Sequence, residues 1–75
     1  MKINVKLMGM LKDRTPEKGE LELTEGQTIL HVLQALEIDP ESVQAFSVNG
    51  KIERNKDAIL NDGDELVVLP PVGGG

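Results

Sequence analysis

The sequence contains no cysteine, no tryptophan and no tyrosine, and Phe46 is its single aromatic residue. Without cysteine the chain can form no disulfide, has no thiolate nucleophile and lacks the sulfur ligands of the usual zinc sites. Any sulfur chemistry would therefore use sulfur borrowed from another molecule.

Basic residues are scarce as well. The chain has 13 Asp and Glu against 8 Lys and Arg, for a formal net charge of −5 at pH 7. Proteins that bind nucleic acid use a basic surface and often stack bases on aromatic side chains. This composition offers neither feature, so we expect no nucleic-acid partner.

Long apolar runs are also missing. A membrane-spanning helix needs about 20 mostly apolar residues, and a secretory signal needs an uninterrupted apolar core. Neither is present, so we expect a cytoplasmic protein without a membrane partner. A single domain of 75 residues has a small core, which leaves no room for an internal catalytic cleft.

What the sequence does have is a set of short alternating segments. Residues 2–7 alternate polar and apolar side chains, which is typical of a strand with one buried face. Residues 9–19 are rich in glycine and charge and indicate a loop, after which Leu21 and Leu23 predict a second inward-facing strand. We expect these two strands to pair as a hairpin.

One helix is predicted at about residues 28–37. Thr28 is a suitable N-cap, and the residues after it are apolar at the spacing i, i+3, i+4, i+7. Asp39-Pro40 would follow the end of this helix, because the residue before a proline disfavours helical backbone.

The rest of the chain predicts more strands. Phe46 and Val48 should face the core, and Asn49-Gly50 is typical of a tight hairpin turn into residues 51–53. Ile59 and Leu60 are expected to cover the sheet edge, and residues 65–69 form a last strand. One helix between two hairpin-like units predicts an α+β fold, with a mixed sheet of four to five strands packed on the helix as in a β-grasp domain over residues 1–69.

Residues 70–75 form a separate C-terminal tail. Pro70 and Pro71 would end the last strand and keep the exit extended, Val72 is the one apolar anchor, and Gly73, Gly74 and Gly75 add only backbone. Six extended residues reach roughly 20 Å. Such a tail could thread a narrow channel and place Gly75 in another protein's active site; the alternative is an ordinary frayed terminus.

Other candidate sites have simpler explanations. His31 lies on the expected exposed flank of the helix, without partners for a catalytic or metal site. The acidic residues Asp57, Asp62, Asp64 and Glu65 do not have the calcium-loop spacing, and turn formation accounts for them. No phosphate-binding loop is present, so we expect no metal and no bound cofactor, ATP included.

The last strand suggests a docking surface. If Leu66 and Val68 face the core, Val67 and Leu69 lie on the opposite face, where Met8 and Met10 are possible neighbours. The alternative is a sheet covered on both sides near its centre.

Taken together, these residues resemble the MoaD/ThiS family of ubiquitin-like sulfur carriers along the whole chain. The resemblance rests on the runs 5–9, 21–28, 48–50 and 60–65 and on the ending Pro70-Pro71-Val72-Gly73-Gly74-Gly75, which is most similar to the small subunit of molybdopterin synthase. Two positions depart from that subunit: Leu69 stands where an aromatic residue is frequent, and Gly73 precedes the final glycine pair.

The resemblance implies a function. An adenylating enzyme of the ubiquitin-activating type would use ATP to activate Gly75, a persulfide donor would convert it to a thiocarboxylate, and the tail would enter the large subunit of molybdopterin synthase with Gly73 and Gly74 in its channel. Val67 and Leu69 would dock the domain on both partners. The chain would be a co-substrate with no catalytic residues beyond its modified terminus.

Other functions remain open from the sequence. The same tail could supply sulfur for thiamine thiazole synthesis or for tRNA or amino-acid thiolation. It could also join the chain to protein lysines as a modifier, or be the inert end of an interaction domain.

Overall fold

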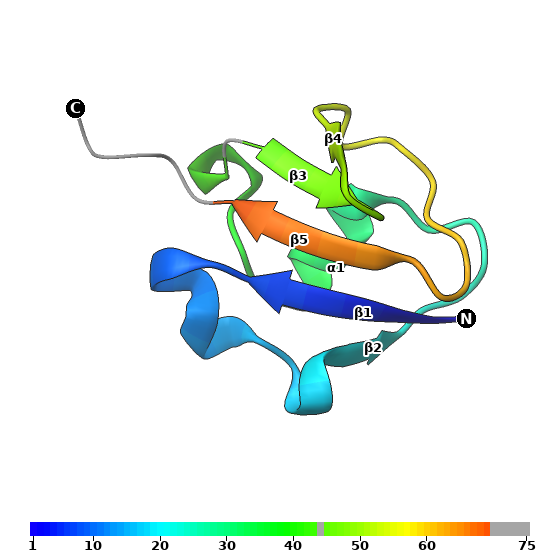
Figure 1. Ribbon diagram of the computed structural model, residues 1–75, viewed down its shortest axis with the longest axis horizontal. Coiled ribbons are helices and arrows are strands. Elements are labelled where there is room, and N and C mark those ends of the chain that lie inside the picture. Colours follow the sequence, from blue (N-terminus) through cyan, green and yellow to red (C-terminus); the bar gives the residue numbers. More distant parts are fainter. Residues whose placement is uncertain (44, 70–75) are drawn as a thin grey trace.

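Alternating side chains in the first and last strands build a sheet with one buried face, and a helix packs on that face (Figure 1). The computed structural model describes residues 1–43 and 45–69. The strands are β1 (Lys2–Leu7), β2 (Glu20–Glu22), β3 (Ala45–Val48), β4 (Lys51–Glu53) and β5 (Glu65–Leu69). The helix is α1 (Ile29–Ala35), and the short 3-10 segments are η1 (Gly9–Arg14), η2 (Glu17–Gly19) and η3 (Pro40–Ser42).

The five strands lie in the order β2-β1-β5-β3-β4. β1 pairs antiparallel with β2 and parallel with β5, while β5 pairs antiparallel with β3. The first and last strands therefore run side by side at the centre of the sheet (Figure 1). This is the mixed sheet and single helix of a ubiquitin-like β-grasp fold, and the predicted fold class is confirmed.

The core fills the space between α1 and the inner face of the sheet. Phe46, at 1% exposure, is its largest buried side chain. The other buried apolar residues are Ile3, Val5, Leu7, Leu11, Ile29, Val32, Leu33, Ile38, Val43, Leu60, Leu66 and Val68. Burying each Val, Leu, Ile or Phe side chain contributes about 1.5–3 kcal/mol before the cost of ordering the chain. The predicted inward parity of the strands is confirmed.

α1 begins and ends by local hydrogen bonds. The Thr28 side chain accepts from the His31 N–H at 3.4 Å, and the Thr28 N–H donates to His31 Nδ1 at 2.9 Å, which closes a reciprocal cap. At the other end Glu37 has φ +59, and the Ile38 N–H donates to the Leu33 carbonyl at 2.8 Å. This left-handed turn stops the helix at Ala35, two residues before the predicted end.

Two further expectations differ from the structure. The predicted loop at residues 9–19 contains η1 and η2, short 3-10 turns that glycine and charge patterns do not reveal. The expectation that Ile59 covers the sheet edge is wrong: Ile59 is 63% exposed, whereas Leu60 is 2% exposed. A backbone bridge between Thr28 and Ile59 fixes the alternation, so Leu60 turns inward and Ile59 outward.

Within residues 1–43 and 45–69, no helix has the length and apolar character needed to cross a membrane.

Candidate functional site

The predicted site depends on where β5 ends. β1 and β3 flank β5 on both sides, with registers that run to Leu7↔Val68 and Ala45↔Leu69. Leu69 is thus held at the end of the central strand. The predicted tail residues Pro70, Pro71, Val72, Gly73, Gly74 and Gly75 lie outside the described residues.

A polar network fixes the start of β5. Asp64 is 8% exposed, and its carboxylate accepts from Asn49 Nδ2 and from the Asn61 N–H, both at 2.8 Å. Asn49 Oδ1 in turn accepts from the Glu65 N–H at 2.9 Å. These bonds tie the β3–β4 turn to β5, and that turn has the expected left-handed backbone, with φ +53 at Asn49 and +85 at Gly50.

Val67 and Leu69 lie on the sheet face opposite α1, as predicted. Their inward neighbours Leu66 and Val68 are fully buried, while Val67 and Leu69 are partly buried. We call this side of the sheet the open face. An apolar pair beside the end of a central strand can contribute contact area to a partner.

Met8 extends the apolar part of the open face. It follows β1, its N–H donates to the Val68 carbonyl at 3.2 Å, and it is 38% exposed. The parallel register of β1 and β5 runs to Leu7↔Val68, so Met8 follows β1 beside the end of β5. Met10 lies in η1, and its side chain is outside what the structure describes.

Three open-face residues were missed by the sequence reasoning. The strand register forms a row in which Ile52 of β4, Ser47 of β3, Val67 and Lys6 of β1 lie across the sheet. Ile52 is 61% exposed and ends this row on the β4 side. The tight turn at 49–50 was the available signal, because a two-residue hairpin places Ser47 opposite Ile52.

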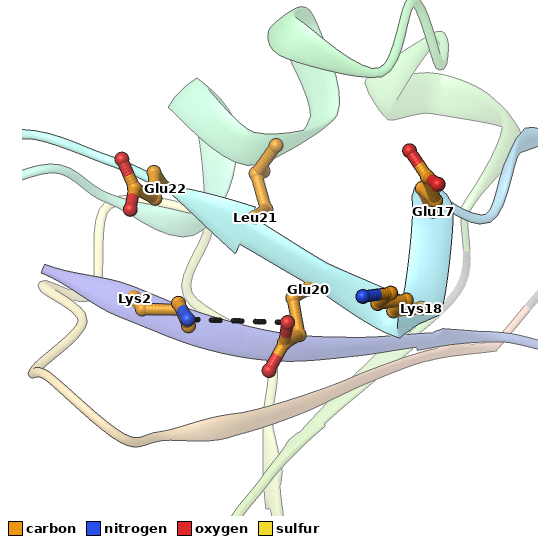
Figure 2. Close-up of a pocket in the computed structure, with 6 residues that line it drawn as sticks. All are labelled: Lys2, Glu17, Lys18, Glu20, Leu21 and Glu22. Carbon is orange, nitrogen blue, oxygen red and sulfur yellow. Dashed lines mark ion pairs between the residues drawn. The ribbon is translucent and has the colours of Figure 1, made fainter.

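The other half of the open face is charged. Lys2 and Asn4 of β1 pair with Glu22 and Glu20 of β2, and Asn4 also pairs with Glu65. Figure 2 shows the β2 side, where Lys2 Nζ lies 3.9 Å from Glu20 Oε1 while Leu21 points toward α1. A hollow of about 360 Å³ here has mostly charged walls, and its exposed ion pair contributes little to stability.

His31 and the acidic turn residues make the local contacts that capping and turn formation require. His31 is exposed and caps α1. Asp62 accepts from the Lys2 N–H at 2.8 Å, and Asp64 belongs to the network above, so turn geometry occupies both carboxylates. Within the described ranges 1–43 and 45–69, no three His, Asp or Glu residues form a group that could hold a metal ion.

The fold matches known structures. A putative molybdopterin converting factor subunit 1 from Pyrococcus furiosus superposes with a TM-score of 0.71 at 24% identity, covering 96% of this chain and 99% of that one. SAMP1 from Haloferax volcanii gives 0.70 at 21% identity, with 100% of both chains covered. A complex of subunits 1 and 2 of molybdopterin-converting factor from Helicobacter pylori 26695 gives 0.58 at 28% identity, again with 100% of both chains covered.

Sequence comparison gives the family directly. No curated protein matches the chain. Residues 5–75, however, match the profile of the ThiS family, a span that runs from the middle of β1 through the helix and the other four strands to the glycine-rich ending. The chain therefore belongs to the ThiS family of ubiquitin-like sulfur carriers.

Proposed function

We propose that this chain carries sulfur on its C-terminal glycine, Gly75, and delivers it in molybdopterin biosynthesis. The observation that carries the proposal is the family match, which continues through residue 75. The proposal requires that Gly75 bear the free carboxylate.

The carboxylate must first be activated. It is ionised at neutral pH and is a poor electrophile. In the proposed sequence a carboxylate oxygen attacks the α-phosphorus of ATP on an adenylating enzyme of the ubiquitin-activating type, and pyrophosphate leaves. The terminal sulfur of a persulfide then displaces AMP, and a thiol cleaves the resulting acyl disulfide to leave a thiocarboxylate. ATP is thus a substrate of the partner, and this chain needs no bound cofactor or metal.

The domain would supply position rather than acid–base chemistry. The strand register holds Leu69 at the end of the central strand, near the partly buried Val67 and the exposed Met8. A partner that covers this apolar half would receive the tail from a fixed point. Gly73 and Gly74 would pass through its channel, because glycine has no side chain to obstruct it.

The acceptor is proposed from the resemblance of the tail and from the neighbouring structures. The Helicobacter pylori protein is solved as a complex of subunits 1 and 2, which supports the large subunit of molybdopterin synthase as the partner that takes the sulfur. Thiamine thiazole synthesis and tRNA thiolation would use the same thiocarboxylate and are separated by which purified acceptor enzyme takes the sulfur. Conjugation to lysines would use the same activated terminus and is an outcome of the test below.

The test is the intact mass of the protein isolated from its native host. Replacing one carboxylate oxygen at Gly75 by sulfur adds about 16 Da to a group that is otherwise an unreactive anion. This gain, located on the terminal peptide, is the expected result. Lysine-linked adducts would instead favour a protein modifier, and an unmodified terminus after incubation with activating enzyme, ATP and sulfur donor would contradict the proposal.

One added residue should prevent activation. We expect a variant with one alanine after Gly75 to show no sulfur gain. The terminal carboxylate would then belong to an alanine, whose Cβ would be excluded from a channel shaped for glycine. The same alanine added before Met1 is the matched control and should load normally. Equal loading of both variants would contradict activation at Gly75.

A further inference from the structure

A groove of about 540 Å³ adjoins the apolar half of the open face. Its walls are mostly apolar and come from the end of β1, the Met8–Gly9 link, η1 and Thr15. The groove is separate from the charged hollow beside β2. Both are lined partly by β1, but they share no lining residue. A volume of this size accommodates one or two side chains of a partner.

The outer wall of the groove is held in place by the core and by local bonds. Leu11 of η1 is 7% exposed and packs in the core, and its N–H donates to the Met8 carbonyl at 3.2 Å. Thr15 Oγ1 donates to the Lys12 carbonyl at 2.7 Å and closes the end of η1. The groove is therefore a shaped feature of the fold and is available without rearrangement.

The charge of the groove contrasts with that of the protein. Lys6 and Lys12 are its charged lining residues in the described part of the chain, and no acidic residue lines it there. The whole chain carries a formal net charge of −5. Apolar walls with two exposed ammonium groups favour a partner segment that combines an apolar side chain with a carboxylate.

The position of the groove links it to the tail. Met8 lines the groove, and its N–H donates to the carbonyl of Val68, next to the last residue of β5. Neighbouring strands lie about 5 Å apart, so an enzyme seated against the end of β5 would lie next to the groove. Glu20, Glu22 and Glu65 lie on the other half of the open face. An acidic partner segment would be repelled by these glutamates and attracted to the groove.

We propose that this groove binds an acidic segment with an apolar side chain, carried by the enzyme that receives the tail. The inference rests on the proposed function only for the identity of that enzyme. The apolar side chain fills the groove beside Met8, and the carboxylate pairs with Lys12 and Lys6. The partner would then dock in one orientation about the axis of β5, because the β1 side of the contact carries Lys6 and Lys12 while the β4 side carries the apolar Ile52.

The groove can be tested without any activation chemistry. The probe is the synthetic peptide acetyl-Asp-Leu-Glu-Leu-Asp-amide, titrated into the full-length ¹⁵N-labelled protein at low salt. We expect amide shifts confined to Lys6, Met8, Gly9, Lys12 and Thr15. A peptide with lysine in place of each acidic residue should not bind.

Charge reversal supplies the matched comparison. Lys12→Glu should weaken peptide binding about three- to tenfold, as expected when an exposed attraction becomes a repulsion. Lys51→Glu changes the same charge on β4, at the far edge of the sheet, and should leave binding unchanged. The thermal midpoints of both variants report that each is folded.

Several outcomes would overturn the proposal. Shifts at residues 51–53, or equal weakening by both variants, would show attraction to the protein's lysines in general. Concentration-dependent shifts at the groove without peptide would show that a second copy fills it. Shifts at Val72–Gly75 during the titration would show that the groove holds the chain's own tail. If the peptide binds as expected but Gly75 never gains sulfur, the groove stands and the proposed function fails.

Discussion

At the residue scale, Asp64 connects three segments of the chain. Its nearly buried carboxylate accepts from the side chain of Asn49 and the backbone of Asn61, and Asn49 accepts from the backbone of Glu65. The sequence predicted a turn at residues 61–64, and Asp64 accepts from the Asn61 N–H within that turn. The bond to Asn49 could not be predicted, because it joins residues 15 positions apart that meet only when β3 and β5 pair.

Removing the Asp64 carboxylate should destabilise the protein. Asp64→Ala leaves the Asn49 amide and the Asn61 N–H without their acceptor, at a cost of about 1–3 kcal/mol in the free energy of unfolding. The exposed Asp57, whose carboxylate accepts no bond in the described structure, provides the control: Asp57→Ala should change stability by less than about 0.5 kcal/mol. Urea unfolding curves measure both, and equal effects would contradict a structural role for the network.

At the element scale, the start of α1 was predictable and its end was not. Thr28 has the residue type and position of an N-cap, and the structure confirms it. The reciprocal bond, which His31 Nδ1 accepts from the Thr28 N–H, was missed because position three of a capping box is usually Glu or Gln. The end was placed two residues late because Glu37, an ordinary helix former, adopts φ +59 there. The buried pair Leu33 and Ile38 holds this turn, so packing overrides propensity.

Loss of the Thr28 cap should be measurable. Thr28→Ala removes the acceptor for the His31 N–H and the hydroxyl that contacts His31 Nδ1 at 3.1 Å, and should cost about 0.5–2 kcal/mol. Thr24→Ala makes the same change at an exposed residue before the helix and should have little effect. Thermal unfolding followed by circular dichroism compares the two, and matching midpoints would argue against the cap.

At the scale of the whole molecule, the fold followed from the predicted order of strands and helix, and the direction of Val67 and Leu69 followed from strand parity. The full extent of the open face did not follow, because Ile52 and Lys6 join Val67 only through the register of four strands. Residues far apart in sequence cannot be assigned to one row until the strand order is known. The tail remains a prediction of the sequence and the family.

Docking through the open face predicts a loss of loading without a loss of folding. Val67→Thr combined with Leu69→Gln keeps side chains of similar size while adding polar groups to the contact. We expect the rate of Gly75 loading by a cognate activating enzyme to fall at least about tenfold, which corresponds to the loss of one well-packed interface residue.

The control for this variant is an exposed apolar residue away from the open face, Ile59. Ile59 is 63% exposed but lies in the segment that bridges to Thr28, away from β5. Ile59→Thr should load at the original rate. A normal loading rate for the open-face variant, with an unchanged thermal midpoint, would remove Val67 and Leu69 from the docking surface.

The central position of β5 also governs how the chain folds during synthesis. Because β1 finds its parallel partner some sixty residues later, at residues 65–68, the sheet cannot close on the ribosome until β5 has emerged. In a nascent chain that ends before β5, β1 can pair only with β2 and β3 only with β4. Two-stranded pairs of this kind are marginally stable alone. The domain and the strand that leads to its glycine ending should therefore become structured in one cooperative step, so that a folded carrier always has its attachment point in place.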